Sequence, residues 1–152
     1  IIDQNLYKII NFMLKINSCN EYDSLKTVIL GSVYENNKIP QLYKDKEQED
    51  FIKIVNQTNE ELKNFEKILQ EHNVKVLRPK QPENKNLIFK EPLINMRDFY
   101  MVYKNIFFSS NNPYIERRFQ NYWMEEIINE LITNGNLIVN ANEINYQTQK
   151  SK

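Results

Sequence analysis

The apolar residues of the chain follow two different spacings, and these spacings predict its helices and strands. From about Glu47 to His72, apolar positions recur at intervals of four and three residues, which places them on one face of a helix. The predicted stripe consists of Phe51, Val55, Thr58, Leu62, Phe65 and Leu69. Asn73 follows at the position where a residue in the left-handed conformation commonly ends a helix. Apolar residues at every fourth position predict a second helix over about Ile115–Asn134, which Gly135 ends.

Short apolar runs rich in β-branched and aromatic residues predict strands around these helices. Leu25–Gly31 and Val74–Leu77 flank the first helix, and Leu137–Val139 follows the second. Met96–Ser110 is predicted to form two strands joined by a hairpin turn at Lys104–Asn105. A coiled coil is the alternative for the first helix, whose stripe is heptad-like, but the flanking strands favour packing on a sheet. The order of elements therefore predicts a mixed α/β fold.

Composition excludes several classes of function. The 152 residues include 20 Lys+Arg and 20 Asp+Glu, so the whole chain has no electrostatic attraction to nucleic acid or to an acidic membrane. A single Cys and a single His exclude an internal disulfide and nearly every transition-metal site. No apolar run approaches the ~18 residues of a membrane helix. We expect a cytoplasmic protein without a metal, a cofactor, a nucleic-acid partner or a membrane partner.

The patterned part of the chain is predicted to be one module. Residues 1–12 read as an extension or as the remnant of an upstream segment, because the chain begins with Ile and Met13 lies just before the first patterned stretch. Residues 13–140 then form the module. Residues 141–152 are polar and without pattern, and we expect them to be a tail.

Three segments of the chain carry a family pattern: Asn20–Gly31 (NEYDSLKTVILG), Leu69–Pro79 (LQEHNVKVLRP) and Met96–Phe119, in which an Arg-Asp pair opens the predicted hairpin. Together they resemble the amidinotransferases, the arginine-using branch of the guanidino-group-modifying enzymes, of the glycine and inosamine-phosphate type. These enzymes have the pentein fold, an α/β propeller that repeats a ββαβ unit around a central channel. The resemblance implies a partial pentein, with about one ββαβ-type unit and the start of the next.

The resemblance also implies a reaction, the transfer of the amidino group of L-arginine to an acceptor amine. In the family, a Cys thiolate attacks the guanidinium carbon, ornithine leaves with the help of a His–carboxylate pair, and the amine then attacks the amidino-cysteine. The family positions of that Cys and that His lie beyond Lys152. We therefore expect the chain alone to be inactive. An open edge would expose apolar surface, so we expect a homo-oligomer or pairing with the missing remainder.

The resemblance assigns substrate-binding roles to three residues. Asp98 matches an aspartate that holds the guanidinium, a planar cation that needs a carboxylate in its plane. The alternative is an ion pair with Arg97 or another basic neighbour, or a capping role at the start of the strand. Arg118 matches an arginine that meets the substrate α-carboxylate, and Arg117 is interchangeable with it in the alignment. The alternative for both is an exposed helix arginine, solvated or paired with Glu. Arg97 is expected to be structural.

The lone His and the lone Cys are not expected to be catalytic. His72 falls on the polar end of the first helix, and Cys19 precedes the first strand without a basic cluster or helix start beside it. Two other functions stay open. One is an arginine deiminase-like hydrolase, in which water replaces the amine, and the other is a non-catalytic single-module protein that binds a partner or a guanidino ligand.

Overall fold

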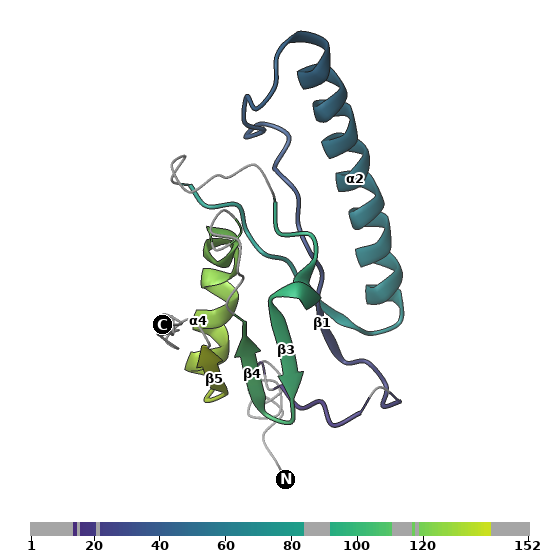
Figure 1. The fold of residues 1–152 in the computed structure, drawn as a ribbon. Coiled ribbons are helices and arrows are strands. Elements are labelled where there is room, and N and C mark those ends of the chain that lie inside the picture. Colours follow the sequence, from purple (N-terminus) through teal and green to yellow (C-terminus); the bar gives the residue numbers. More distant parts are fainter. Residues whose placement is uncertain are drawn as a thin grey trace, which may run out of the picture.

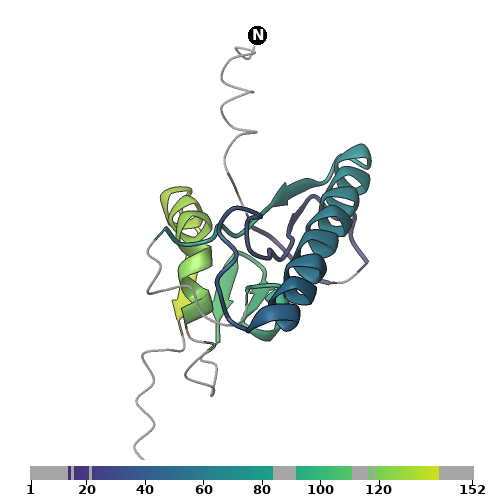
Figure 2. The same cartoon turned by 90° about the horizontal axis from the view of Figure 1, so that it is seen from above.

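The computed structural model describes residues 14, 16–20, 22–83, 92–110, 117 and 119–140, and it has two small sheets between two helices. The long helix and the short helix lie on opposite sides of the strands, as the two perpendicular views show (Figures 1 and 2). The elements are β1 (Thr27–Ile29), α2 (Asp45–Glu71), β2 (Lys75–Leu77), the 3₁₀ helix η2 (Met96–Asp98), β3 (Tyr100–Tyr103), β4 (Ile106–Ser109), the 3₁₀ helix η3 (Phe119–Met124), α4 (Glu125–Thr133) and β5 (Leu137–Asn140). The prediction of a mixed α/β fold is confirmed. The predicted extension (1–12) and the predicted tail (141–152) lie outside the described residues.

Each sheet contains a parallel pair of strands that a helix connects. β1 pairs with β2 in parallel, and α2 is the connection between them. In the second sheet β4 lies in the centre, antiparallel to β3 and parallel to β5. Along the chain, η3 and α4 come after β4 and before β5. The register sets Phe107 of β4 opposite Val102 and Ile138. The second sheet with α4 therefore has the order strand, strand, helix, strand.

The left-handed backbone conformation occurs at both predicted helix ends and at the predicted hairpin turn. Asn73 follows α2 with φ of 60°, and Gly135 follows α4 with φ of 74°. Lys104 has φ of 52° between β3 and β4, where the hairpin turn is predicted. These residues end both helices and close the hairpin where the sequence indicates, so that the direction of the following strand is set locally.

The buried face of α2 is narrower than predicted. Val55 is buried, and Phe51 and Leu62 pack against the core, but the Phe65 side chain is 48% exposed. The predicted buried stripe is wrong at Phe65. The sheet beneath this part of the helix has two strands of three residues each, which is too narrow to cover the whole stripe.

Two predicted elements are shorter in the structure. The first strand begins at Thr27, and Leu25 is 51% exposed. In place of one long second helix, the described residues are α-helical at 117, 3₁₀-helical at 119–124 and α-helical again from Glu125, while residues 115, 116 and 118 lie outside the described part. In a 3₁₀ helix residues three apart lie on one face, which lets Gln120 and Trp123 both face the core.

Aromatic side chains connect the two halves of the core. Tyr34, in the loop after β1, is fully buried, with edge-to-face contacts to Phe51 at 6.0 Å and to Trp123 at 5.9 Å between ring centroids. Phe51 belongs to α2 and Trp123 to η3. One aromatic ring therefore packs against elements from both sides of the molecule, with edge-to-face geometry that adds to the burial energy.

Buried glutamines hold the loops to this core. Gln81 accepts a hydrogen bond from the backbone N–H of Glu35 at 2.9 Å and donates one to the carbonyl of Lys38 at 3.0 Å. Gln120 donates to the carbonyl of Pro92 at 3.0 Å. Because both side chains are buried, these bonds replace the water that the loop backbone would otherwise need.

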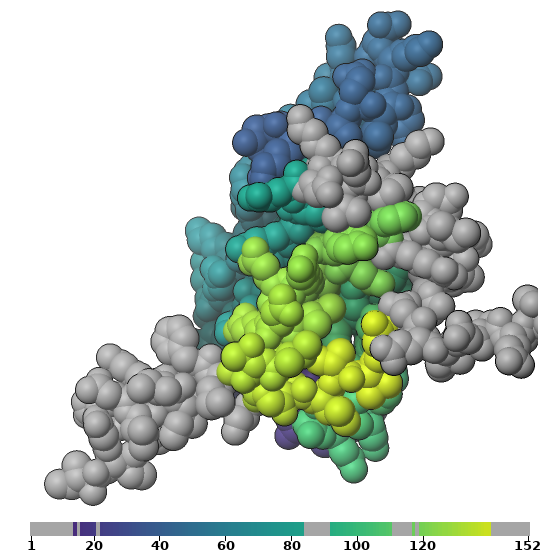
Figure 3. Space-filling view, turned by 90° about the vertical axis from the view of Figure 1, so that its left-hand side faces the viewer, coloured from purple at the N-terminus to yellow at the C-terminus, as the bar shows by residue number. Residues whose placement is uncertain are grey.

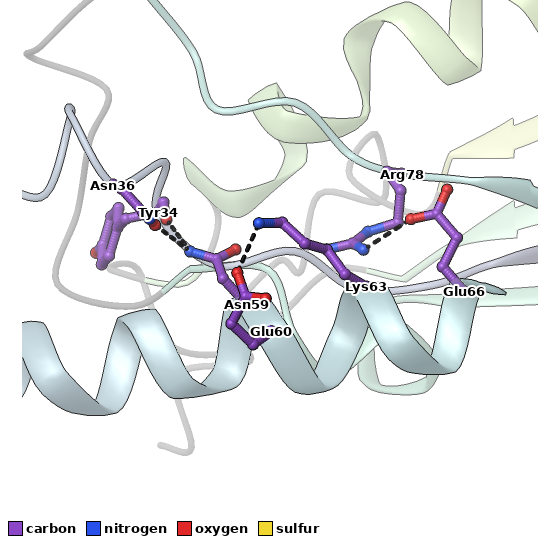
Figure 4. A network of polar contacts seen from close by, with 7 residues as sticks. All are labelled: Tyr34, Asn36, Asn59, Glu60, Lys63, Glu66 and Arg78. Carbon is purple, nitrogen blue, oxygen red and sulfur yellow. Dashed lines mark hydrogen bonds and ion pairs between the residues drawn. The ribbon is translucent and has the colours of Figure 1, made fainter. Parts of the chain in front are cut away.

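A polar network joins α2 to the loop after β1 and to the end of β2 (Figure 4). The Arg78 guanidinium donates to the Glu66 carboxylate at 3.2 Å and to the Ser32 hydroxyl at 3.3 Å. The Asn59 amide donates to the carbonyl of Tyr34 at 2.8 Å. These polar contacts hold α2 where the sheet of β1 and β2 is too narrow to cover its apolar stripe. None of the described helices is long and apolar enough to cross a bilayer.

Candidate functional site

Asp98 lies at the entrance of the second sheet, at the end of η2 and before the first residue of β3. The sequence places it on a strand, and the structure corrects this to a 3₁₀ turn. Its backbone N–H donates to the carbonyl of Asn95 at 3.3 Å, and its own carbonyl accepts from the Ser110 hydroxyl at 3.1 Å. The Ser110 N–H donates to the carbonyl of Phe99 at 2.6 Å. The open end of the β3–β4 hairpin therefore fixes the backbone on both sides of the carboxylate.

The Asp98 side chain already holds a guanidinium group, that of Arg117. Oδ2 of Asp98 and Nη2 of Arg117 are 3.2 Å apart, and the guanidinium carbon lies 4.7 Å from the centroid of the Phe99 ring. The side chains of Asp98 and Arg117 are 37% and 24% exposed, and Phe99 is fully buried beneath them. A carboxylate beside an aromatic face is a suitable binding arrangement for a planar cation, through charge-assisted hydrogen bonds and a cation–π contact.

The structure thus brings together two of the three predicted site residues. Of the alternatives for Asp98, it shows an ion pair with a basic neighbour, and that neighbour is Arg117, nineteen residues along the chain. Arg97 is exposed, and Arg118 lies outside the described residues. The substrate-binding roles of Asp98, Arg117 and Arg118 stay predictions.

The short distance between Asp98 and Arg117 restricts what the pair can bind. The guanidinium and the α-carboxylate of arginine are separated by the whole aliphatic part of the side chain, whereas the two protein groups are in contact. As they stand, they cannot hold the two ends of the same arginine. A ligand guanidinium that stacks on Phe99 beside Asp98 would have to take the place that Arg117 occupies.

The lone His and the lone Cys each contact a residue close to them in the sequence. His72 is the C-cap residue of α2, and its Nδ1 lies 2.8 Å from the carbonyl oxygen of Ile68. Cys19 is exposed, with Sγ 3.7 Å from Oδ1 of Asn17. That neither side chain is catalytic stays a prediction. Among the described residues, no group of three or more His, Cys, Asp or Glu side chains is placed to hold a metal ion.

Two neighbours of the site, Phe99 and Tyr100, are missing from the predicted site residues. Phe99 is buried in the core, and its face also supports the Arg117 guanidinium. The hydroxyl of Tyr100 donates to Oδ1 of Asn121 in η3 at 2.7 Å, and burial raises the pKa of this phenol well above its ordinary value. The signal for Phe99 is its place directly after the Arg-Asp pair. The Tyr100–Asn121 bond joins segments that no short motif connects.

Tyr100 predicts how stability responds to alkaline pH. Because the folded-state pKa is raised, the folded protein keeps the proton that the unfolded chain loses near pH 10. The contribution of Tyr100 to the free energy of unfolding is therefore fully present below pH 10 and decreases above it, by up to about 1.4 kcal/mol per pH unit. We expect Tyr100→Phe to remove this part of the decrease and to lower stability near pH 7 by about 1 kcal/mol through loss of the Asn121 bond. Urea unfolding at pH 7 to 11 measures both effects, and identical pH curves for the two proteins would contradict the prediction.

Comparisons with known proteins were made for the sequence and for the structure. No protein-family model and no curated protein sequence matches the chain. Solved structures do match, and two of them are amidinotransferases. SxtG, an amidinotransferase from Microseira wollei in the saxitoxin biosynthetic pathway, matches with a TM-score of 0.64 and 24% sequence identity over 83% of this chain. The inosamine-phosphate amidinotransferase StrB1 from Streptomyces griseus matches with a TM-score of 0.63 and 19% identity over 83% of this chain.

The chain has the fold of part of an amidinotransferase. The predicted resemblance is confirmed at the level of the fold. The match covers 41% of the SxtG chain and 42% of the StrB1 chain, so this chain spans about two fifths of the length of the amidinotransferases it matches.

Proposed function

We propose that the chain is the N-terminal portion of an amidinotransferase that takes the amidino group from L-arginine and transfers it to an amine. The observation that carries the proposal is the Asp98 carboxylate, which binds a guanidinium above the Phe99 ring in a fold similar to part of an amidinotransferase. That guanidinium belongs to Arg117, so it serves as a substitute for the guanidinium of a substrate. The surroundings that suit one group suit the other.

In this proposal Asp98 accepts hydrogen bonds from the substrate guanidinium after Arg117 has moved off the carboxylate. The backbone bonds around Asp98 keep the carboxylate in one place, so the plane of the cation is fixed relative to an attacking group. The substrate α-carboxylate then falls to Arg118, or to Arg117 once it is free of Asp98. The nucleophilic Cys and the base His come from polypeptide outside these 152 residues.

The proposed reaction has two transfers at one carbon. The thiolate adds to the guanidinium carbon, the bond from that carbon to the δ-nitrogen of ornithine breaks, and the base supplies the proton that the leaving amine needs. The acceptor amine then adds to the amidino-cysteine and returns a proton to the base, and the carbon–sulfur bond breaks to regenerate the thiolate. The contribution of the present chain is to hold and orient the cation, and the 152 residues alone are expected to give no turnover.

Products from labelled arginine test the proposal in the full-length gene product. With arginine labelled at the guanidino carbon and a set of amines, we expect ornithine together with a labelled amidino compound whose formation requires the amine. Labelled citrulline formed without an amine would instead indicate the deiminase-like hydrolase. If no product forms and titration calorimetry of the protein shows tight binding of arginine, the chain belongs to a non-catalytic binding protein.

Replacing the carboxylate tests the role of Asp98. We expect Asp98→Asn to lower kcat/KM for arginine by about 100-fold in the full-length protein, because removing one partner of a partly desolvated charge pair weakens binding by about 2 kcal/mol or more. Steady-state kinetics measures the change, and circular dichroism verifies the fold. Asp23→Asn is the matched control, since that carboxylate is exposed and bonds to Asn20 near the N-terminal end. Equal kcat/KM for Asp98→Asn and wild type would remove the basis of the proposed site.

A further inference from the structure

One face of the β3–β4–β5 sheet carries apolar side chains at every position. Alternate residues of a strand point to the same face, and the register aligns them in two rows. One row runs from Met101 through Phe108 to Val139, and the other from Tyr103 through Ile106 to Leu137. We call these six residues the open sheet face. Figure 3 shows β5, which carries two of them, at the surface of the molecule beside α4.

The open sheet face differs from the other face of the same strands in its burial. Met101, Leu137, Tyr103 and Val139 are 60%, 53%, 51% and 39% exposed. On the opposite face Phe107 is fully buried, and it packs in the core with Trp123 and residues of α4. A sheet with one apolar face in the core and a second apolar face at the surface is not the alternating pattern of a sheet that faces water. The composition of the open sheet face indicates a surface that another polypeptide covers.

The size of this face decides between two kinds of occupant. Four side chains that are each about half exposed present on the order of 400 Å². A second copy of the chain on this face would bury about 800 Å² in total, less than the roughly 1,200–2,000 Å² of a stable protein–protein interface. Contacts between units of one folded body are commonly this small, about 600–1,500 Å². The face is therefore better suited to a unit of the same fold than to a dimer.

We propose that the open sheet face is the docking surface for the part of the amidinotransferase-like fold that the 152 residues do not contain, through an apolar face of a further α/β unit. About three fifths of the SxtG and StrB1 chains has no counterpart in this chain, so each matched fold holds polypeptide that can lie there. Lys104, whose ammonium lies 5.6 Å from the centroid of the Tyr103 ring, marks one corner of the surface. The inference rests on the fold and is independent of the arginine chemistry.

Thiol labelling tests the docking surface by comparing the full-length gene product with the 152-residue chain. In a Cys19→Ser background, a cysteine replaces Met101 or Leu137, and the rate of its reaction with a maleimide dye is followed by peptide mass spectrometry, so that any other Cys of the full-length protein does not contribute. We expect labelling at least 10-fold slower in the full-length protein than in the 152-residue chain. Ile54→Cys is the matched control, since Ile54 is 63% exposed on α2, and its labelling rate should be the same in both proteins.

Each other outcome counts against the proposal. Equal labelling rates at Met101→Cys in the two proteins would show that nothing covers the face. If the full-length protein has no more than 152 residues, fast labelling of it would show the same. Protection of the 152-residue chain that grows with its own concentration would assign the face to a second copy. If the cysteine variants do not fold, the Met residues of the unaltered proteins offer a second readout, because oxidation of Met101 by peroxide should be slower in the full-length protein by a similar factor. These rates do not depend on arginine, so their failure is distinguishable from failure of the proposed activity.

Discussion

Gly31→Ala is expected to destabilise the protein by about 3 kcal/mol or more, because there is no room for a side chain at this position. A Cβ atom built on Gly31 would overlap the backbone carbonyl of Ile94. Next to it, the Ser32 N–H donates to the carbonyl of Leu93 at 2.8 Å, so the two backbone segments are held together beside the glycine. The two backbones cannot separate without breaking this bond and exposing the fully buried Leu93 side chain.

Urea unfolding followed by circular dichroism measures the effect of Gly31→Ala, and two further variants separate its cause. The clash is with backbone atoms, so shortening the neighbour in the double variant Gly31→Ala, Ile94→Ala should restore nothing. Gly135→Ala is the control for backbone strain alone, because its Cβ would lie in open space while φ is 74°. We expect that variant to lose only about 1 to 2 kcal/mol. A Gly31→Ala protein as stable as Gly135→Ala would show that the two segments are not in contact.

The position of Gly31 also concerns the candidate site. Ile94 lies two residues before η2, which ends at Asp98. A displacement at Ile94 is therefore expected to move the carboxylate as well. Local sequence around Asp98 gives no hint of this, because the glycine that the site depends on is far away in the chain and belongs to the loop after β1.

Much of the fold could be predicted because local backbone preferences determine it. The left-handed residues Asn73 and Gly135, the hairpin around Lys104 and the existence of each strand follow from residue type and from short-range periodicity. The exposure of Phe65 could not be predicted in this way. It depends on the width of the sheet that β1 and β2 form, which is a pairing between residues nearly fifty positions apart.

The candidate site was predictable in its residue types and not in its contacts. Asp98 and Arg117 were both selected through the resemblance, as ligands for opposite ends of a substrate. Their mutual ion pair joins residues nineteen positions apart, and no periodicity describes that contact. The 3₁₀ turn at Asp98 was also missed, because the apolar and aromatic residues that follow resemble a continuous strand.

Phe107→Ala and Phe108→Ala are expected to differ greatly although the two residues are neighbours on one strand. Phe107 is fully buried in the central strand of the second sheet and stacks on Tyr100 at 5.3 Å between centroids, so its loss leaves a cavity. We expect Phe107→Ala to lower the free energy of unfolding by about 3 to 5 kcal/mol, which is a large part of the stability of a small domain. Phe108 points to the open sheet face, and Phe108→Ala should lower it by about 1 kcal/mol in the 152-residue chain.

The same pair of variants distinguishes the isolated chain from a longer protein. If another unit covers the open sheet face, the cost of Phe108→Ala should approach that of a core residue in the full-length protein, whereas the cost of Phe107→Ala should stay the same. Thermal and urea unfolding of both variants in both proteins gives the four values. A small effect of Phe107→Ala in the 152-residue chain would mean that α4 does not pack on this sheet. The covered face of β4 would then be the one that carries Phe108. The register of β3 and β4, which positions Asp98, would have to be different.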